Sequence, residues 1–165
     1  RMLARLDRAI QEVTWSPDGR WVVVRTDNGG AGAGDLVGVR TSGDTTPVAL
    51  AASEFTELHP AVSPDGRWLA YTSNESGANE VYVRPFPATS GGRWQVSTGG
   101  GNQPQWSRDG RELYFIDDHD DMIAVPVQGG AEFEAGQPVS DAQPYGSLVW
   151  LRRERQRQQR EEAMV

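Results

Sequence analysis

The most concentrated chemistry in the sequence is the run Asp117-Asp-His-Asp-Asp121. Carboxylate oxygens and an imidazole nitrogen are ligands for calcium or transition-metal ions. This makes four residues candidate metal ligands: Asp117, Asp118, Asp120 and Asp121. The run also joins two apolar segments, which end at Ile116 and begin at Met122, so a solvated hairpin loop is the alternative. The residues themselves leave both interpretations open.

The residue types needed for several kinds of catalysis are missing. The sequence has no Cys, and each of its 16 basic residues is Arg. Cysteine nucleophiles, thiolate zinc sites and Schiff-base lysines are therefore excluded. The glycine-rich segment 29–34 has neither the lysine nor the following helix of a phosphate-binding loop. Since no G-x-S-x-G elbow occurs either, we expect a protein that is not an enzyme and has no cofactor.

The formal net charge is −7, and it is unevenly distributed. Residues 1–151 hold 11 Arg against 20 Asp and Glu, and residues 152–165 hold 5 Arg against 3 Glu. An acidic body without a basic face argues against a nucleic-acid partner. No apolar stretch approaches the roughly 20 residues of a membrane span, so we expect no membrane contact by this segment.

An internal repeat organises the chain. Three segments align without gaps: 13–25, 61–72 and 105–116. Their central residues Asp18, Asp65 and Asp109 lie 47 and then 44 residues apart. Periods in the forties with strand-like content are typical of one four-stranded propeller blade per repeat. The high content of 19 Gly and 10 Pro agrees with many tight turns.

Each repeat contains a turn whose residue types suit the backbone conformation at their positions. Proline fits the first corner of a type I turn, aspartate follows it, and glycine takes the left-handed position that closes the hairpin with a bulge. The predicted structural turn residues are Pro17, Asp18, Gly19, Pro64, Asp65, Gly66, Asp109 and Gly110. A nearly continuous apolar run follows each turn, as expected for strands covered on both faces.

The sequence thus predicts an all-β protein, with about three four-stranded antiparallel blades of a β-propeller. First strands are expected at 12–16, 60–63 and 104–107, second strands at 21–25, 68–72 and 113–116, and third strands at 35–40, 80–86 and 122–127. Fourth strands are expected at 47–50, 93–97 and near 138–140. The predicted blades span 12–51, 59–98 and 103–140, after an end of a preceding blade or linker at 1–11. Residues 141–165 form a polar Arg/Gln/Glu tail with helix-forming residues.

The segments 64–77, 80–87 and 106–115 resemble the TolB-type, WD40-like propeller repeat. They are similar above all to the C-terminal propellers of bacterial membrane-anchored serine/threonine protein kinases. The resemblance covers about residues 10–140 and stops after Val139. It implies a six-bladed propeller of which this chain is about half, without catalytic residues. It also implies an extracytoplasmic or periplasmic location and a role in sensing.

Three residues are candidates for contact with a protein or small ligand. His59 precedes a proline at the start of a first strand, which places it near the axial opening of a propeller. Asn102 lies in a predicted blade crossing, and Trp94 falls outside the repeated aromatic positions, as does Trp150. For the repeated aromatics Trp15, Trp21, Trp68, Tyr71, Trp106, Tyr114 and Phe115 we expect packing between blades.

The sequence therefore favours a non-catalytic binding or scaffold module. The alternatives are the gating propeller of a prolyl-oligopeptidase-type serine peptidase and a stand-alone TolB-like periplasmic scaffold. Three blades cannot close a ring, since propellers have at least about four. We therefore expect the terminal blades to present open faces, through which the chain self-associates or aggregates.

Overall fold

The computed structural model describes residues 2–27, 34–129 and 132–144 as an all-β protein. Three antiparallel sheets follow one another along the chain, and each has its strands in sequence order. The first sheet, blade 1, consists of β1 (Ala9–Trp15), β2 (Trp21–Asp27), β3 (Gly34–Arg40) and β4 (Val48–Ala51). This is the meander of a propeller blade, as the sequence predicted.

Blade 2 repeats the same arrangement, and blade 3 varies it. Blade 2 consists of β5 (Glu57–Val62), β6 (Trp68–Ser73), β7 (Glu80–Pro85) and β8 (Trp94–Gln95), with the short 3-10 helix η1 (Thr89–Gly91) before β8. Blade 3 consists of β9 (Asn102–Trp106), β10 (Glu112–Ile116), β11 (Asp121–Gly129), β12 (Phe133–Ala135) and β13 (Val139–Pro144).

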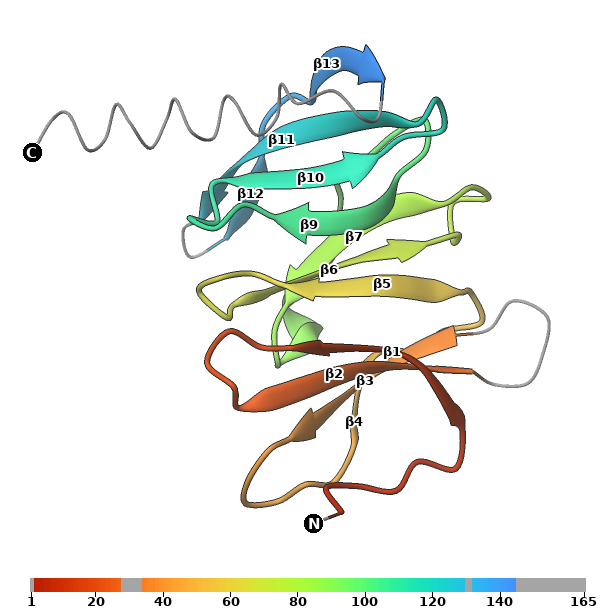
Figure 1. Cartoon of the computed structure of the whole chain (residues 1–165), viewed down its shortest axis with the longest axis vertical. Helices are drawn as coiled ribbons and strands as arrows, with labels where there is room; N and C mark the ends of the chain where they lie inside the picture. Colours follow the sequence, from red (N-terminus) through yellow and green to blue (C-terminus); the bar gives the residue numbers. More distant parts are fainter. Residues whose placement is uncertain (1, 28–33, 130–131, 145–165) are drawn as a thin grey trace, which may run out of the picture.

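The three blades are stacked along the long axis of the molecule (Figure 1). The first strands β1, β5 and β9 lie on one side, and each of β5 and β9 contacts the preceding blade. The turns between first and second strands all lie at one end, which we call the turn end. The connections between consecutive blades lie at the opposite end, as do those between second and third strands in blades 2 and 3, and we call this the crossing end (Figure 1).

Two apolar cores lie between the blades rather than within them. The core between blades 1 and 2 consists of Trp21, Val23, Leu36, Leu50, Ala51, Val62, Leu69, Tyr71, Tyr82 and Phe86. The core between blades 2 and 3 includes Ala61, Trp68, Ala70, Val81, Val83, Val96, Leu113, Phe115, Ile123, Val125, Val127 and Phe133. Blade 2 therefore buries both faces, and all six residues of β6 are buried. This explains why its sequence is nearly continuously apolar.

Several predicted strand bounds differ from the structure. β1 begins at Ala9, within the segment predicted to be a linker, and β8 has two residues where five were predicted. In blade 3 the fourth strand is split, because β12 pairs with the last three residues of β11 and β13 pairs with its first half. The sequence placed this strand near residues 138–140 only, and β13 runs on to Pro144.

The aromatic residues follow the predicted packing with two exceptions. Trp21, Trp68, Tyr71 and Phe115 are buried between blades, and Trp106 packs against the core between blades 2 and 3. Trp15 is 60% exposed, because no blade of the described residues covers the outer face of blade 1. Tyr114 is half-buried and lies on the face of blade 3 that points away from blade 2.

The predicted polar tail was to begin at residue 141, but residues 141–144 belong to β13. The rest of that tail, 145–165 with Trp150, and most of the glycine-rich segment 29–34 lie outside the described residues. Among the residues that are described, no helix is long and apolar enough to cross a membrane.

Candidate functional site

The turn end is built from three turns with the same hydrogen bonds. In blade 2 the Ser63 hydroxyl donates to Asp65 Oδ1 at 2.5 Å, and the same oxygen accepts the Arg67 backbone N–H at 3.1 Å. The Ser63 oxygen in turn accepts the Trp68 backbone N–H at 3.0 Å. Blades 1 and 3 repeat these bonds around Asp18 and Asp109.

Glycine has the predicted left-handed conformation in all three turns. The φ angles of Gly19, Gly66 and Gly110 are 68°, 70° and 71°. Burial raises the pKa of Asp65, but hydrogen bonds from Ser63 and Arg67 outweigh it, so that the pKa lies below its usual value. At Asp18 the hydrogen bond from Ser16 has the largest effect and lowers the pKa. These carboxylates therefore act as hydrogen-bond acceptors within their own turns.

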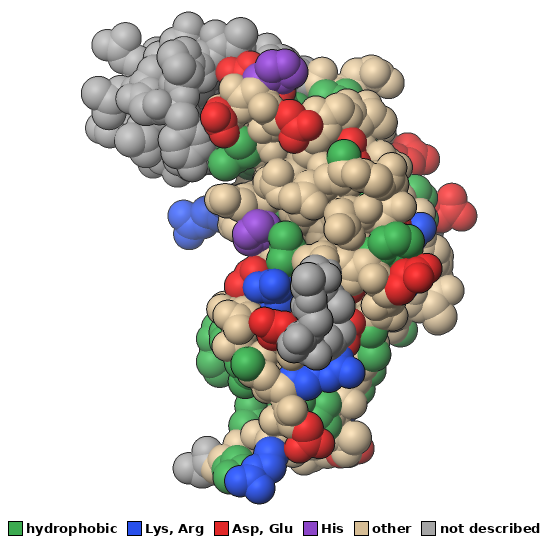
Figure 2. Space-filling model, turned by 90° about the vertical axis from the view of Figure 1, so that its right-hand side faces the viewer, with side chains coloured by type: hydrophobic (Ala, Val, Ile, Leu, Met, Phe, Trp, Pro, Cys, Tyr) green, Lys and Arg blue, Asp and Glu red, His purple; other side chains and the backbone are tan. Residues whose placement is uncertain are grey.

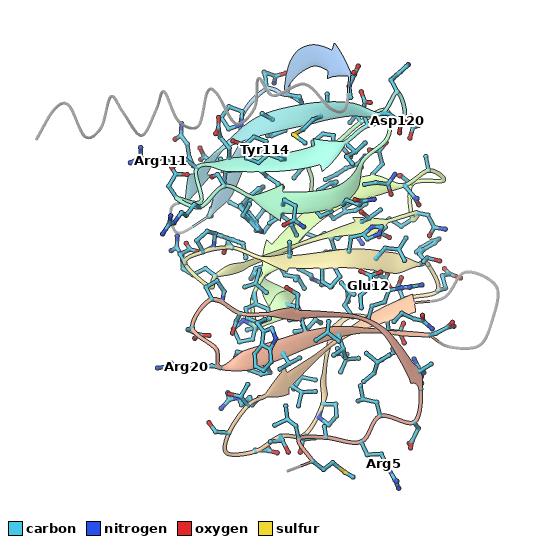
Figure 3. The ribbon with its side chains drawn as sticks, viewed as in Figure 1. Arg5, Glu12, Arg20, Arg111, Tyr114 and Asp120 are labelled. Carbon is cyan, nitrogen blue, oxygen red and sulfur yellow. The ribbon has the colours of Figure 1, made fainter. Side chains whose placement is uncertain are left out.

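Two equivalent grooves lie at the turn end, one at each boundary between blades. The groove between blades 2 and 3 has a volume of about 460 Å³ and is lined by Asp65, Trp68, Gly110, Val127 and Gln128 among others. The groove between blades 1 and 2, about 370 Å³, is lined by their repeat equivalents Asp18, Trp21, Gly66, Phe86 and Pro87. Figure 3 labels Arg20 and Arg111, which line these grooves, at this end.

The crossing end carries a different set of polar side chains. Glu12, His59 and Gln103 each lie four residues before the serine of their turn, so they occupy one repeat position in three consecutive first strands. The ladder is irregular next to each of them, which indicates a β-bulge. His59 and Gln103 also have positive φ angles of 51° and 53°. Such backbone conformations in non-glycine residues are frequent at functional sites.

Glu12 connects the first two blades at this end. One of its carboxylate oxygens accepts the backbone N–H of His59 at 2.8 Å, and the other lies 3.5 Å from Arg25 Nη1. The side chains of Glu12 and Arg25 are 28% and 22% exposed. Both therefore reach the surface, and Figure 3 labels Glu12 at the end opposite to Arg20 and Arg111.

Unsatisfied hydrogen-bonding groups are concentrated beside this pair. Three buried atoms without a partner in the described structure lie here: Arg25 Nε, Glu57 Oε2 and His59 Nδ1. Strand pairing joins Glu12 to Arg25, and Gly34 lies close to both Arg25 and the Glu57 backbone. Elsewhere in the described residues, Trp68 Nε1, Thr72 Oγ1 and Arg84 Nε also lack partners. Buried polar groups without partners are rare in native proteins and need an explanation.

Glu57 is the most unusual member of this group because it is a carboxyl that is only 3% exposed. The Ser53 hydroxyl donates to its Oε1 at 2.5 Å, and its Oε2 has no partner. Burial raises the pKa of Glu57, and the nearby acids Asp35 and Glu75 raise it further, against the hydrogen bond from Ser53.

Asn102 lies at the crossing from blade 2 to blade 3, where the sequence placed it. Its Oδ1 accepts a hydrogen bond from Asn79 Nδ2 at 3.2 Å. The crossing itself is held by Glu80, which is 5% exposed. Glu80 accepts the backbone N–H groups of Gly99 and Gly100 at 2.9 and 3.1 Å, as well as the Ser97 hydroxyl.

The acidic run 117–121 forms a tight hairpin turn rather than a cluster of ligands. Asp117 Oδ1 accepts the backbone N–H groups of His119 and Asp121 at 2.8 and 2.9 Å. The side chain of Asp118 lies against Gly100 of the blade crossing, and Asp120 has a φ of 61°. Among the described residues no three His, Asp or Glu side chains are placed to hold a metal ion. The structure therefore does not bring the four predicted ligands together.

Trp94 is packed between blades 2 and 3. Its ring meets Trp68 edge-on at 5.6 Å between centroids and is tilted against Phe133 at the same distance. The sequence left open a surface contact for this residue, and its partly buried position in the core between blades 2 and 3 gives it a structural role.

The crossing end is seen face-on in Figure 2. Both histidines of the chain are visible there, together with several acidic and arginine side chains. The sequence identified His59 and Asn102 but missed Glu12, Arg25, Glu57 and Gln103. The alignment of the repeats could have found Glu12 and Gln103, because both share the repeat position of His59.

Comparison with known proteins identifies the fold. No protein-family model and no curated protein sequence matches the chain. Solved structures do match it. TolB from Acinetobacter baumannii has a TM-score of 0.61 at 16% identity, over 85% of this chain and 39% of that protein. The tricorn protease gives 0.60 at 12% identity, over 82% of this chain and 17% of that protein.

A third match is the β-propeller domain of the Trilobed protease from Pyrococcus furiosus. Its TM-score is 0.55 at 16% identity, over 84% of this chain and 44% of that domain. The chain thus spans less than half the length of each of these proteins. At such low identity the likeness defines the fold alone: the three sheets are blades of a β-propeller.

Proposed function

We propose that the chain is a non-catalytic propeller module that binds a protein or a small polar ligand at its crossing end. The observation that carries this proposal is the group of buried polar atoms without partners around Glu12, Arg25, Glu57 and His59. An unpaired buried donor or acceptor costs about 1–3 kcal/mol, which a ligand with matching groups would recover. Sites of this kind combine a rigid scaffold with a few convergent polar groups.

The turn end is less suited to this role, although the two grooves between the blades lie there. Its carboxylates already accept hydrogen bonds from the serine and the backbone of their own turns. A ligand there would compete with these bonds. At the crossing end, the Glu12 carboxylate and the Arg25 guanidinium are partly exposed and Gln103 is exposed, which suits a ligand that has both donors and acceptors.

We also propose that the module has no catalytic activity. Neither histidine is oriented by a hydrogen-bonded carboxylate in the described structure. His59 Nδ1 has no partner, and His119 Nδ1 lies 3.8 Å from Asp117 while its side chain is 81% exposed. A base without an orienting group is a poor candidate for activating a nucleophile.

The larger context is also proposed. We place the module in a bacterial signalling protein, where it would couple binding outside the cell to a cytoplasmic kinase. The gating propeller of a serine peptidase and a TolB-like scaffold are the alternatives. An adjoining coding sequence with a kinase domain and a membrane span supports the first, a downstream G-x-S-x-G segment supports the second, and a cleavable signal peptide without a kinase supports the third.

Titration of isotope-labelled protein with pools of soluble tetrapeptides and of small polar molecules tests the binding proposal. We expect at least one pool to shift the backbone amide signals of residues 57–59 and 102–103. His59→Ala and Glu12→Gln should weaken that response at least fivefold. Arg111→Ala, a control at the turn end, should leave it unchanged. Shifts confined to the turn end, or no shift from any pool, would contradict the proposed site.

A further inference from the structure

The groove between blades 1 and 2 at the turn end contains an arginine that the repeat does not explain. Arg40, which lines this groove, is the last residue of β3 and pairs with Trp21 of β2. In blades 2 and 3 the residues that pair with the repeat equivalents of Trp21 are Pro85 and Pro126. A blade therefore forms without a charged side chain at this position. Arg40 distinguishes this groove from the one between blades 2 and 3.

An aromatic surface holds the Arg40 side chain in place. The rings of Trp21 and Phe86, one from each blade, meet edge-on at 5.9 Å between centroids and are 9% and 7% exposed. The Arg40 guanidinium lies over the Trp21 ring, 5.0 Å from its centroid. This cation–π contact orients the guanidinium without using its N–H groups. Among the described residues the Arg40 guanidinium has no hydrogen-bond or ion-pair partner, so its donors are left for a ligand.

A second arginine reaches the groove from the neighbouring strand. Arg20 directly precedes β2 and is labelled at the turn end in Figure 3. The backbone N–H of Thr41 donates to the Arg20 carbonyl at 2.9 Å, and the Thr41 hydroxyl donates to the Gly19 carbonyl at 2.9 Å. These bonds fix the backbone of Arg20 beside that of Arg40. The two guanidinium groups therefore come from a rigid part of blade 1.

The charged side chains that line the groove leave a positive excess. They are Arg20, Arg40 and Asp18, so two positive charges stand against one negative charge. Asp18 Oδ2 lies 3.7 Å from Arg20 Nε. Asp44 does not line the groove, and its carboxylate accepts the hydroxyl and the backbone N–H of Thr46 at 2.6 and 2.9 Å. An excess of one positive charge suits a ligand with a single negative charge.

We propose that the groove between blades 1 and 2 binds a carboxylate that is attached to an aromatic or other apolar group. Arg40 and Arg20 donate N–H groups to the carboxylate oxygens, since a guanidinium matches a carboxylate in a bidentate geometry. The apolar group contacts Trp21, Phe86 and Pro87. The volume of about 370 Å³ is at the small end of the range for ligand pockets. A small free acid and the C-terminal residue of a peptide share this chemistry.

The proposed ligand is compatible with the hydrogen bonds of the turn end. A ligand that bound the turn carboxylates would displace the donors that they already have, whereas a ligand carboxylate needs donors of its own. The bonds from the Ser16 hydroxyl and the Arg20 backbone N–H to Asp18 therefore stay intact. The site lies at the end of the molecule opposite to Glu12, as Figure 3 shows, and is independent of the binding proposed for the crossing end.

Titration of isotope-labelled protein with N-acetylphenylalanine, followed by NMR, tests this site. We expect saturable shifts of the backbone amides of residues 20–21 and 40–42 and of the Trp21 indole N–H. N-acetylphenylalaninamide has the same ring but no carboxylate and should bind at least tenfold more weakly. Phenyl phosphate should bind more weakly than benzoate, because its charge of about −1.5 to −2 exceeds the single positive excess. Tighter binding of the tripeptide Gly-Gly-Phe than of N-acetylphenylalanine assigns the site to peptide C-termini, and the reverse order assigns it to small free acids.

Variants of the arginines test the proposed contacts. Arg40→Ala should weaken the binding of N-acetylphenylalanine at least tenfold, and Arg40→Lys, which keeps the charge without the planar fork, at least threefold. Arg40 is exposed, so a dispersed amide spectrum is expected for both variants and shows that they remain folded. Arg111→Ala is the matched control, because Arg111 lines the other groove at the repeat position of Arg20. It should leave the binding unchanged.

Four results overturn the proposal. They are the absence of saturable shifts with every carboxylate, equal binding of the acid and its amide, tighter binding of phenyl phosphate than of benzoate, and unchanged binding in Arg40→Ala. Equal shifts at Trp68 and Gln128 of the groove between blades 2 and 3 overturn it as well, since that groove has no equivalent of Arg40. Shifts at residues 57–59 and 102–103 belong to the crossing end, so each titration distinguishes the two proposals.

Discussion

At the level of single residues, carboxylates stabilise this fold mainly through backbone N–H groups. Asp18, Asp65 and Asp109 each accept a serine hydroxyl and the N–H two residues further along the chain. The accompanying arginine pairs are exposed, and two of the three exceed 3.5 Å. Exposed ion pairs contribute little to stability, so the hydrogen bonds are the more important part of the motif.

We therefore expect Asp65→Ala to lower the free energy of unfolding by about 1 kcal/mol, because two hydrogen bonds to a half-exposed carboxylate are lost. Urea denaturation at pH 7 measures the change. Asp65→Asn retains one acceptor oxygen and should lose less. Glu54→Ala, on an exposed bend, is the control and should change stability very little. A loss as large in the control as in Asp65→Ala would contradict this role.

Whereas Asp65 is expected to stabilise the fold, we expect Glu57 to lower the free energy of unfolding at neutral pH. Burial raises its pKa in the folded state, so the folded protein binds this proton more tightly than the unfolded chain does. Stability from this residue is therefore present below the unfolded pKa and falls as the pH rises through the folded pKa. Glu57→Gln, which cannot ionise, should be more stable than the wild type at pH 7. Its advantage should shrink at pH 4.

Urea denaturation of both proteins at pH 4 and pH 7 checks this expectation. The lowered pKa values of Asp18, Asp65 and Asp117 make stability rise with pH over the acidic range, but they are common to both proteins and cancel in the difference. A Glu57→Gln protein that is less stable than the wild type at pH 7 would show that the buried carboxylate is stabilising.

At the level of elements, the repeated turn could be read from the sequence because its residues act locally. Proline, aspartate and glycine set the backbone angles over four residues, and the strand that follows is apolar on both faces. The split fourth strand of blade 3 could not be predicted in this way. In residues 129–138 the polarity alternates only over the short stretch 131–135, which lies between glycines, so the pairing with β11 is needed to define β12 and β13.

The candidate site was predictable in part for the same reason. His59 and Asn102 were found because they sit beside a proline and a glycine run that locate the end of a blade. Glu57 and Glu80 were missed, since a charged residue in a sequence suggests solvent exposure. Both are buried by contacts between successive blades. Such contacts join residues that are distant in the sequence, so a local sequence pattern does not predict them.

Glu80 should control the local stability of the crossing between blades 2 and 3. In Glu80→Ala the N–H groups of Gly99 and Gly100 lose their acceptor, which we expect to cost about 2–3 kcal/mol because the lost bonds involve a buried charge. Hydrogen exchange followed by NMR should show faster exchange at these two amides. Glu75→Ala, which removes an acid paired with Arg93 in the neighbouring turn, should leave them unchanged. Equal effects from both variants would contradict the assignment.

At the level of the whole molecule, the three blades form a linear stack with a distinct middle. Blade 2 contributes to both apolar cores, whereas blades 1 and 3 contribute to one each. In such quasi-one-dimensional proteins, stability depends on the interfaces between neighbouring units. The end units are therefore expected to open at lower cost than the middle one.

Native-state hydrogen exchange should accordingly give the slowest amides in β6 and β7, whose residues are almost all buried. We expect β1 to exchange faster, because Val13 and Trp15 of this strand are 57% and 60% exposed. Uniform protection of all three blades would contradict this expectation and show that the stack unfolds as one unit.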